Sequence, residues 1–153
     1  MPEKETLERA REDAREGKSP ATQAGEFVRE EIHHIREGKH GARNAKQAIA
    51  IGLSKARRAG VKLGAPNPKT SSAATRKKAA QDSARSPRRT KPSPQRSRAT
   101  EEALEREGHS AGTKLALSRH AHQSAMARGK KSRASAAKKA ARTRAHTSKT
   151  RAK

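Results

Sequence analysis

The sequence predicts a chain that is mostly α-helical and disordered: a small N-terminal three-helix domain, then a long basic tail with short transient helices. Only 13 of its 153 residues are Leu, Ile, Val or Phe, and the formal net charge is +23. Ten of these large apolar residues lie within residues 1–63, and none lies in 64–103. A highly charged chain with so few large apolar side chains cannot bury enough surface to fold throughout.

Three segments of residues 1–63 place apolar side chains on one face at helical spacing. We expect helices over 4–16, 20–37 and 42–59. Ser19 and Pro20 suit the N-cap and the first turn of the second helix. Glycines suited to helix C-termini follow the three segments: Gly17, Gly38 and Gly60. Val61 and Leu63 are expected to pack back onto the third helix.

The remaining 90 residues divide by composition into three parts. Residues 64–100 are rich in Pro, Ser and basic side chains and are expected to form a disordered linker. Residues 101–128 are expected to form weak short helices, Glu101–Glu107 and Thr113–Arg128. Residues 129–153 form a Lys/Ala/Arg tail, in which like charges oppose helix formation in free solution.

Charge is distributed unevenly along the chain. Residues 1–37 carry a net charge of −3, and residues 38–153 carry +26. Inside a cell such a polycation meets nucleic acid and anionic lipid. We expect nucleic acid, with duplex DNA favoured and RNA possible, and no membrane, because a membrane-surface helix needs large apolar side chains opposite its charges.

Dibasic steps among Ala and Ser are the candidate phosphate contacts of the tail, since phosphate neutralisation needs no fixed geometry. The alternative is a solvated charge run. A basic second face of the third helix is a further candidate, beside the alternative of a plain solvated face. The predicted nucleic-acid-binding residues are Lys77, Lys78, Arg88, Arg89, Lys130, Lys131, Lys138, Lys139, Arg142 and Arg144, with Arg43, Lys46 and Arg57 in the third helix.

The sequence predicts neither a metal site nor a cofactor nor catalysis. Cysteine is absent, so thiolate ligands and disulfides are excluded. His33 and His34 are adjacent and are expected to point away from the apolar face, and His40, His120 and His122 are expected to lack nearby carboxylate ligands. Tyr and Trp are absent, which argues against base stacking on aromatic side chains.

Three stretches carry a resemblance to a known group of proteins: residues 12–20 (EDAREGKSP), 30–41 (EEIHHIREGKHG) and 47–60 (QAIAIGLSKARRAG). Residues of about 7–63 resemble a small uncharacterised bacterial domain family that occurs in short basic proteins of soil and plant-associated bacteria. The resemblance implies a bacterial context and no mechanism. The tail is similar in composition to linker-histone-like tails of bacteria. Ser86-Pro87-Arg88-Arg89 resembles the minor-groove repeats of linker-histone tails, beside the alternative of ordinary linker composition.

The function expected from these observations is non-enzymatic, sequence-tolerant DNA binding in the cytoplasm, associated with the nucleoid, by histone-like coating or condensation. Self-association through residues 1–63 would let the protein bridge DNA segments. Two alternatives stay open: a protein-interaction module with acidic N-terminal helices, and an RNA- or ribosome-binding protein, because phosphate contacts are shared by DNA and RNA.

Overall fold

Three N-terminal helices form the first part of the chain: α1 (Lys4–Arg15), α2 (Pro20–Arg36) and α3 (Ala45–Arg58). The computed structural model describes residues 2–69, 71–85 and 93–151. The three helices lie where their apolar spacing predicts them. Ser19 caps α2 as predicted, since its side chain accepts a hydrogen bond from the Thr22 backbone N–H.

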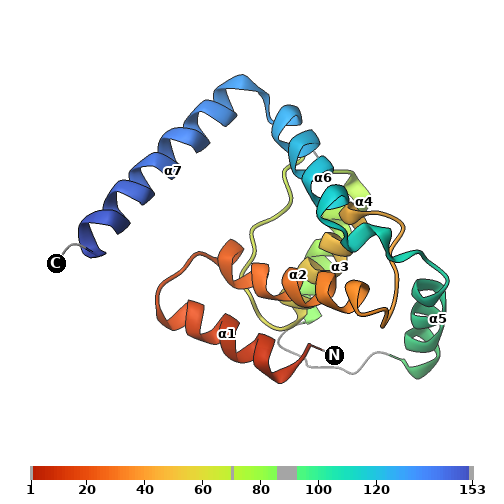
Figure 1. The fold of residues 1–153 in the computed structure, drawn as a ribbon. Helices are drawn as coiled ribbons and strands as arrows, with labels where there is room; N and C mark the ends of the chain where they lie inside the picture. Colours follow the sequence, from red (N-terminus) through yellow and green to blue (C-terminus); the bar gives the residue numbers. More distant parts are fainter. Residues whose placement is uncertain (1, 70, 86–92, 152–153) are drawn as a thin grey trace. The chain divides into compact units, whose positions relative to one another are not determined.

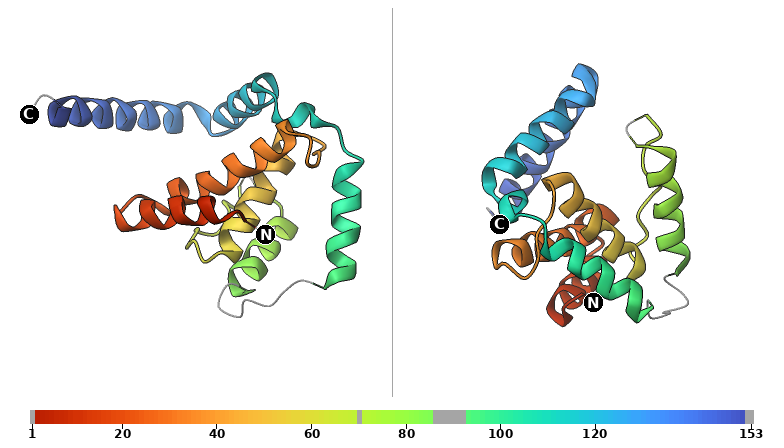
Figure 2. Two further views of the ribbon diagram at one scale, coloured as in Figure 1. Left: turned by 60° about the horizontal axis from the view of Figure 1, so that its bottom comes forward. Right: turned by 90° about the vertical axis from the view of Figure 1, so that its right-hand side faces the viewer.

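α2 packs against α3, and α1 runs beside α2 (Figures 1 and 2). A Cβ atom on Gly52 would lie 2.7 Å from the Val28 Cα and 3.0 Å from the Phe27 carbonyl oxygen. Glycine is therefore required for the two helix backbones to come this close.

Two small apolar clusters form the core. Phe27 is at the centre of one, with Ala10, Ala24 and Ala56. As predicted, Val61 packs against it, together with Leu63. The second cluster comprises Ile32, Ile35, Ala42, Ala48 and Ala111, so it includes a residue far beyond the N-terminal helices. Alanines fill much of both clusters, and this lets the helices pack with few large side chains.

The prediction of a long disordered tail is wrong. Within the described residues the chain continues as four further α-helices and one short 3-10 helix: α4 (Ala73–Arg85), α5 (Pro94–Glu105), η1 (His109–Gly112), α6 (Lys114–Ala127) and α7 (Gly129–Arg151). The chain forms two compact units, residues 1–117 and 118–153.

A polar contact fixes α4 against α3, in the segment expected to be a linker. Asp82 is 2% exposed and accepts a hydrogen bond from the Ser54 hydroxyl at 2.7 Å. Ala79, one turn earlier, is also buried. Neither residue is a large apolar one, so the distribution of Leu, Ile, Val and Phe along the sequence does not predict this contact.

The segment between α5 and α6 packs against the loop after α2 and against α2 itself. The Gly41 backbone N–H donates to the Leu104 carbonyl at 2.9 Å. A Cβ atom on Gly41 would overlap the Glu107 carbonyl group, so this crossing also requires glycine. Arg36 Nε donates to the Gly112 carbonyl at 2.7 Å, which ties η1 to the end of α2.

The second unit contains α7, a continuous helix in the segment predicted to be a mostly disordered tail (Figure 1). Its residues are mainly Ala, Lys, Arg, Ser and Thr, and the first three have high helix propensity. Repulsion between its cations opposes the helix, but like-charge pairs three or four residues apart destabilise a helix by only about 0.2–0.5 kcal/mol each. Helix propensity therefore outweighs charge repulsion in this segment, contrary to the prediction.

Candidate nucleic-acid interface

Residues 118–153 contain 12 basic residues and no acidic one. Gly129, with φ +79°, marks the junction of α6 and α7. Arg133 reaches back across it, where its Nη1 donates to the carbonyls of Ala125 at 3.4 Å and Met126 at 3.3 Å. A guanidinium group thereby satisfies carbonyls at the C-terminal end of α6.

Four of the predicted tail residues share one side of α7. At ~100° per residue, they fall within an arc of about 100° and extend over about 16 Å of the helix axis. All four are exposed, and they are Lys131, Lys138, Lys139 and Arg142. We call these four residues the basic face of α7. Lys130 and Arg144 are also exposed, outside this arc.

Of the other predicted tail residues, Lys77 and Lys78 lie exposed on α4. Lys78 Nζ is 3.6 Å from the Asp82 carboxylate, so part of its charge is compensated. Arg88 and Arg89 lie outside the described residues. Four of the predicted cations thus share one exposed side of α7, whereas α4 has two, and one of these pairs with Asp82.

The second face of α3 is only partly open. Lys46 is exposed at the beginning of the helix and Arg57 is half-buried near its end. Ser54, between them, bonds Asp82 of α4. Arg43 precedes the helix, with its Nε 3.6 Å from the Glu107 carboxylate. Ser54, in the middle of this second face, and Arg43, one of its three predicted cations, are therefore already engaged in contacts with other parts of the first unit.

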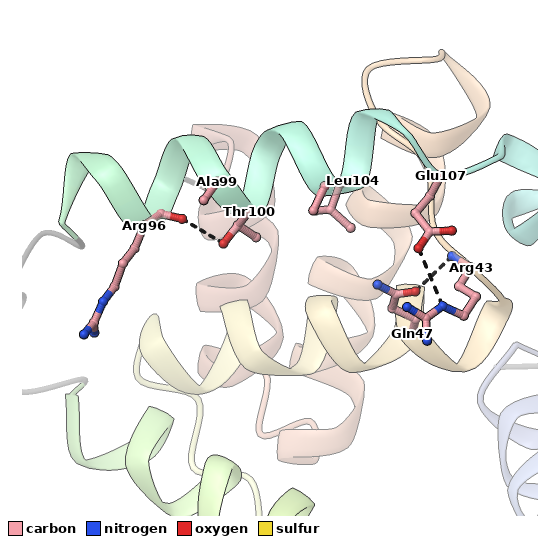
Figure 3. Close-up of a pocket in the computed structure, with 8 residues that line it drawn as sticks. Arg43, Gln47, Arg96, Ala99, Thr100, Leu104 and Glu107 are labelled. Carbon is pink, nitrogen blue, oxygen red and sulfur yellow. Dashed lines mark hydrogen bonds and ion pairs between the residues drawn. The ribbon is translucent and has the colours of Figure 1, made fainter.

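A groove lies between the beginning of α3 and α5 (Figure 3). Its volume is about 490 Å³, and Arg43, Gln47, Arg96, Leu104 and Glu107 are among the residues that line it. Basic and acidic side chains both line the groove, and Gln47 Oε1 accepts from the Arg43 backbone N–H at 2.9 Å. Thr100 and Glu107 supply the hydroxyl and the carboxylate of the lining.

A buried polar network that the sequence did not predict joins α2 to α3. Glu30 and Glu31 are 4% and 1% exposed. Lys55 of α3 lies with its Nζ 3.3 Å from Glu30 Oε1 and 2.6 Å from Glu31 Oε2. The positions of Glu30 and Glu31 beside the apolar face of α2 are the sequence signal for this network, but two acidic residues predict a solvated surface by default.

Two expectations about histidines were wrong. His34 is buried rather than pointing away from the core, and its Nε2 is 2.8 Å from Glu3 Oε1. His40 has a carboxylate neighbour, because its Nε2 is 3.1 Å from Glu31 Oε1. The turn after α2 brings His40 back to this face, and sequence spacing alone does not show it.

Glu3 shows the electrostatic effect of this arrangement. The hydrogen bond with His34, and next the one with Lys39, hold the pKa of the Glu3 carboxyl below its usual range. Lys39 also pairs with Glu37 at 3.0 Å, and the pKa of its ammonium group is raised accordingly. The ionised carboxylate of Glu3 and the protonated ammonium group of Lys39 are thus each stabilised by the side chains that they contact.

Residues 17–69 match a family of unknown function, DUF6496. The matched segment contains α2 and α3, which confirms that this part of the chain is similar to an uncharacterised small domain. No curated protein and no solved structure matches the chain significantly. Among the described residues, no helix combines the length and the apolar character that a membrane span needs.

Proposed function

We propose that the protein is a non-enzymatic, sequence-tolerant DNA-binding protein whose main contact surface is the basic face of α7. The observation that carries this proposal is a set of four exposed cations on one arc of a helix. The unit of residues 118–153 contains no acidic residue to compensate them.

The spacing of the basic face suits a polyphosphate partner. Its axial extent of about 16 Å corresponds to about five base-pair steps at 3.4 Å each, so its cations can lie along a run of phosphates. Binding would release counterions, which supplies affinity at modest ionic strength.

Sequence tolerance follows from the chemistry of the side chains. Lysines and arginines among Ala, Ser and Thr contact phosphates, whereas sequence specificity requires side chains held against base edges. The chain has no Tyr or Trp for stacking on unpaired bases, which favours a duplex over a single strand. In a bacterial cell this mode of binding would coat the nucleoid, and self-association through residues 1–63 would add condensation.

Charge-matched variants of the full chain test the proposal. The test variant replaces six basic residues of α7 with Ala: Lys130, Lys131, Lys138, Lys139, Arg142 and Arg144. The control variant replaces six exposed basic residues of the first unit with Ala: Lys4, Arg11, Arg15, Arg29, Lys62 and Lys69. Both variants lose the same formal charge, so a difference between them reports position rather than net charge.

Fluorescence anisotropy with a labelled duplex measures the affinities. We expect the α7 variant to bind far more weakly than the control variant, with little dependence on duplex sequence. Equal affinities would contradict a role for α7 and leave only a general charge effect. Competition by duplex DNA, structured RNA and heparin separates the proposal from the RNA alternative, since preferential displacement by RNA would favour that alternative.

A further inference from the structure

Three potential metal ligands converge at the C-terminal end of α2, in a region that the proposed DNA binding does not use. Glu31, His34 and His40 each offer one ligand atom, and these atoms all lie within 4.8 Å of one another. Glu31 is 1% exposed, His34 is 9% exposed, and the His40 side chain is 14% exposed. The group is therefore a largely buried cluster, unlike a set of solvated acidic residues.

The hydrogen bonding of His40 indicates that a cation belongs in this cluster. Its Nδ1 lies 3.1 Å from the Gly41 carbonyl oxygen, which can only accept, so Nδ1 carries the proton. In the neutral ring, Nε2 then presents a lone pair to Glu31 Oε1 at 3.1 Å. Two acceptors this close repel each other unless a proton or a metal ion lies between them.

The surroundings match those of metal-binding imidazoles and carboxylates. A metal-ligating histidine usually donates its other ring N–H to a carbonyl or carboxylate, as His40 does to Gly41. His34 Nε2 has Glu3 Oε1 at 2.8 Å as such a neighbour. Lys55 Nζ is 2.6 Å from Glu31 Oε2, which leaves Oε1 as the atom directed at His40.

We propose that Glu31, His34 and His40 bind a divalent transition metal of the zinc type. Imidazole and carboxylate are accepted ligands of Zn²⁺, and ligand atoms around a tetrahedral ion lie about 3.3 Å apart, close to the 3.1 Å between His40 Nε2 and Glu31 Oε1. Water would complete the coordination. The ion would tie the turn after α2 to the helix, which is a structural role separate from DNA binding.

The test uses the full chain without an affinity tag and with His120 and His122 replaced by Gln, so that these two histidines cannot contribute. Zinc binding is measured by calorimetry, and Co²⁺ substitution reports tetrahedral geometry through its visible d–d absorption. We expect one ion per chain, with an affinity that rises as pH increases through the histidine range, because protons compete for imidazole.

Ligand variants and a matched control complete the test. His40→Gln and Glu31→Gln should each weaken zinc binding by at least about tenfold. His33→Gln is the control, because His33 is exposed on the same helix and pairs with Glu37; it should bind zinc like the parent. Absence of a tetrahedral Co²⁺ spectrum, or equal zinc affinity in all three variants, would overturn the proposal in favour of an imidazolium–carboxylate pair.

If a ligand variant fails to fold, thermal unfolding of the parent protein still tests the proposed zinc site. Zinc that binds only the native state raises the melting temperature of the parent, and the stabilisation grows with the logarithm of the free zinc concentration above the dissociation constant. A melting temperature that is the same with zinc and with a chelator would also overturn the proposal. DNA binding by the zinc-free protein is expected to be unchanged. The proposal of a zinc site and the proposal of DNA binding through α7 can therefore be refuted independently.

Discussion

Replacing Gly52 by Ala tests the close packing of α2 and α3. The new methyl group would lie 2.7 Å from the Val28 Cα, 2.9 Å from the Val28 backbone nitrogen and 3.0 Å from the Phe27 carbonyl oxygen. All three atoms belong to the backbone, so no side-chain rotation relieves the overlap. Overpacking costs about 1–3 kcal/mol, and the higher helix propensity of Ala returns about 1 kcal/mol. We expect a net loss near the upper end of this difference, about 2 kcal/mol.

Thermal and urea unfolding followed by circular dichroism measure this loss. For a unit of this size, about 2 kcal/mol corresponds to a melting temperature lower by about 8 °C. The matched control is Gly25→Ala, a mid-helix glycine of α2 where a methyl group would have no atom within 4 Å. This control should gain about 0.4–1 kcal/mol. If Gly52→Ala were as stable as Gly25→Ala, the described crossing of α2 and α3 would be refuted.

Two further predictions concern polar contacts. Asp82→Ala should lower the stability of the first unit by about 1–3 kcal/mol in urea unfolding, because the Ser54 hydroxyl loses its acceptor. The control is Gln81→Ala, which replaces an exposed neighbour and should change stability little. Equal losses in the two variants would argue against the contact between α4 and α3. The pKa of the Glu3 carboxyl is lower in the folded protein than in the unfolded chain, so on acidification the unfolded chain takes up the proton first. The stability that ionised Glu3 contributes is therefore fully present above the unfolded-state pKa and is lost as pH falls through the folded-state pKa. Stability measured between about pH 5 and pH 3 should therefore fall less steeply in Glu3→Gln than in the parent, and identical pH profiles would contradict the assignment.

The first three helices could be predicted from the sequence because each combines helical apolar spacing with a local start or stop signal. Ser19 and Pro20 begin α2, and Gly38, with φ +76°, follows its end. Such signals act within a few residues and need no knowledge of the tertiary structure.

The later helices could not be predicted by counting large apolar residues. Asp82 holds α4 through a hydrogen bond to a residue 28 positions earlier, and Gly41 permits a backbone crossing with residues far along the chain. Both contacts depend on tertiary proximity. The composition of α7 contains both opposing effects, high helix propensity and charge repulsion, and the prediction gave the greater weight to repulsion.

The candidate site residues also fall into those that the sequence predicts and those that depend on the tertiary structure. Exposed lysines and arginines such as Lys138 and Lys139 can be identified from composition, because phosphate binding asks mainly for charge density. The convergence of Glu31 and His40 depends on the turn that follows α2, and residue spacing alone suggested no ligand set.

The salt dependence of DNA affinity tests the central claim most directly. With about ten phosphates engaged, the plot of log K against log salt concentration should have a slope of about −9 for the parent. Loss of the four contacts of the basic face in the α7 variant should reduce the magnitude of the slope by about 4, while the charge-matched variant of the first unit should keep a slope close to that of the parent. A parent slope near zero, or the same slope in both variants, would contradict DNA binding through α7.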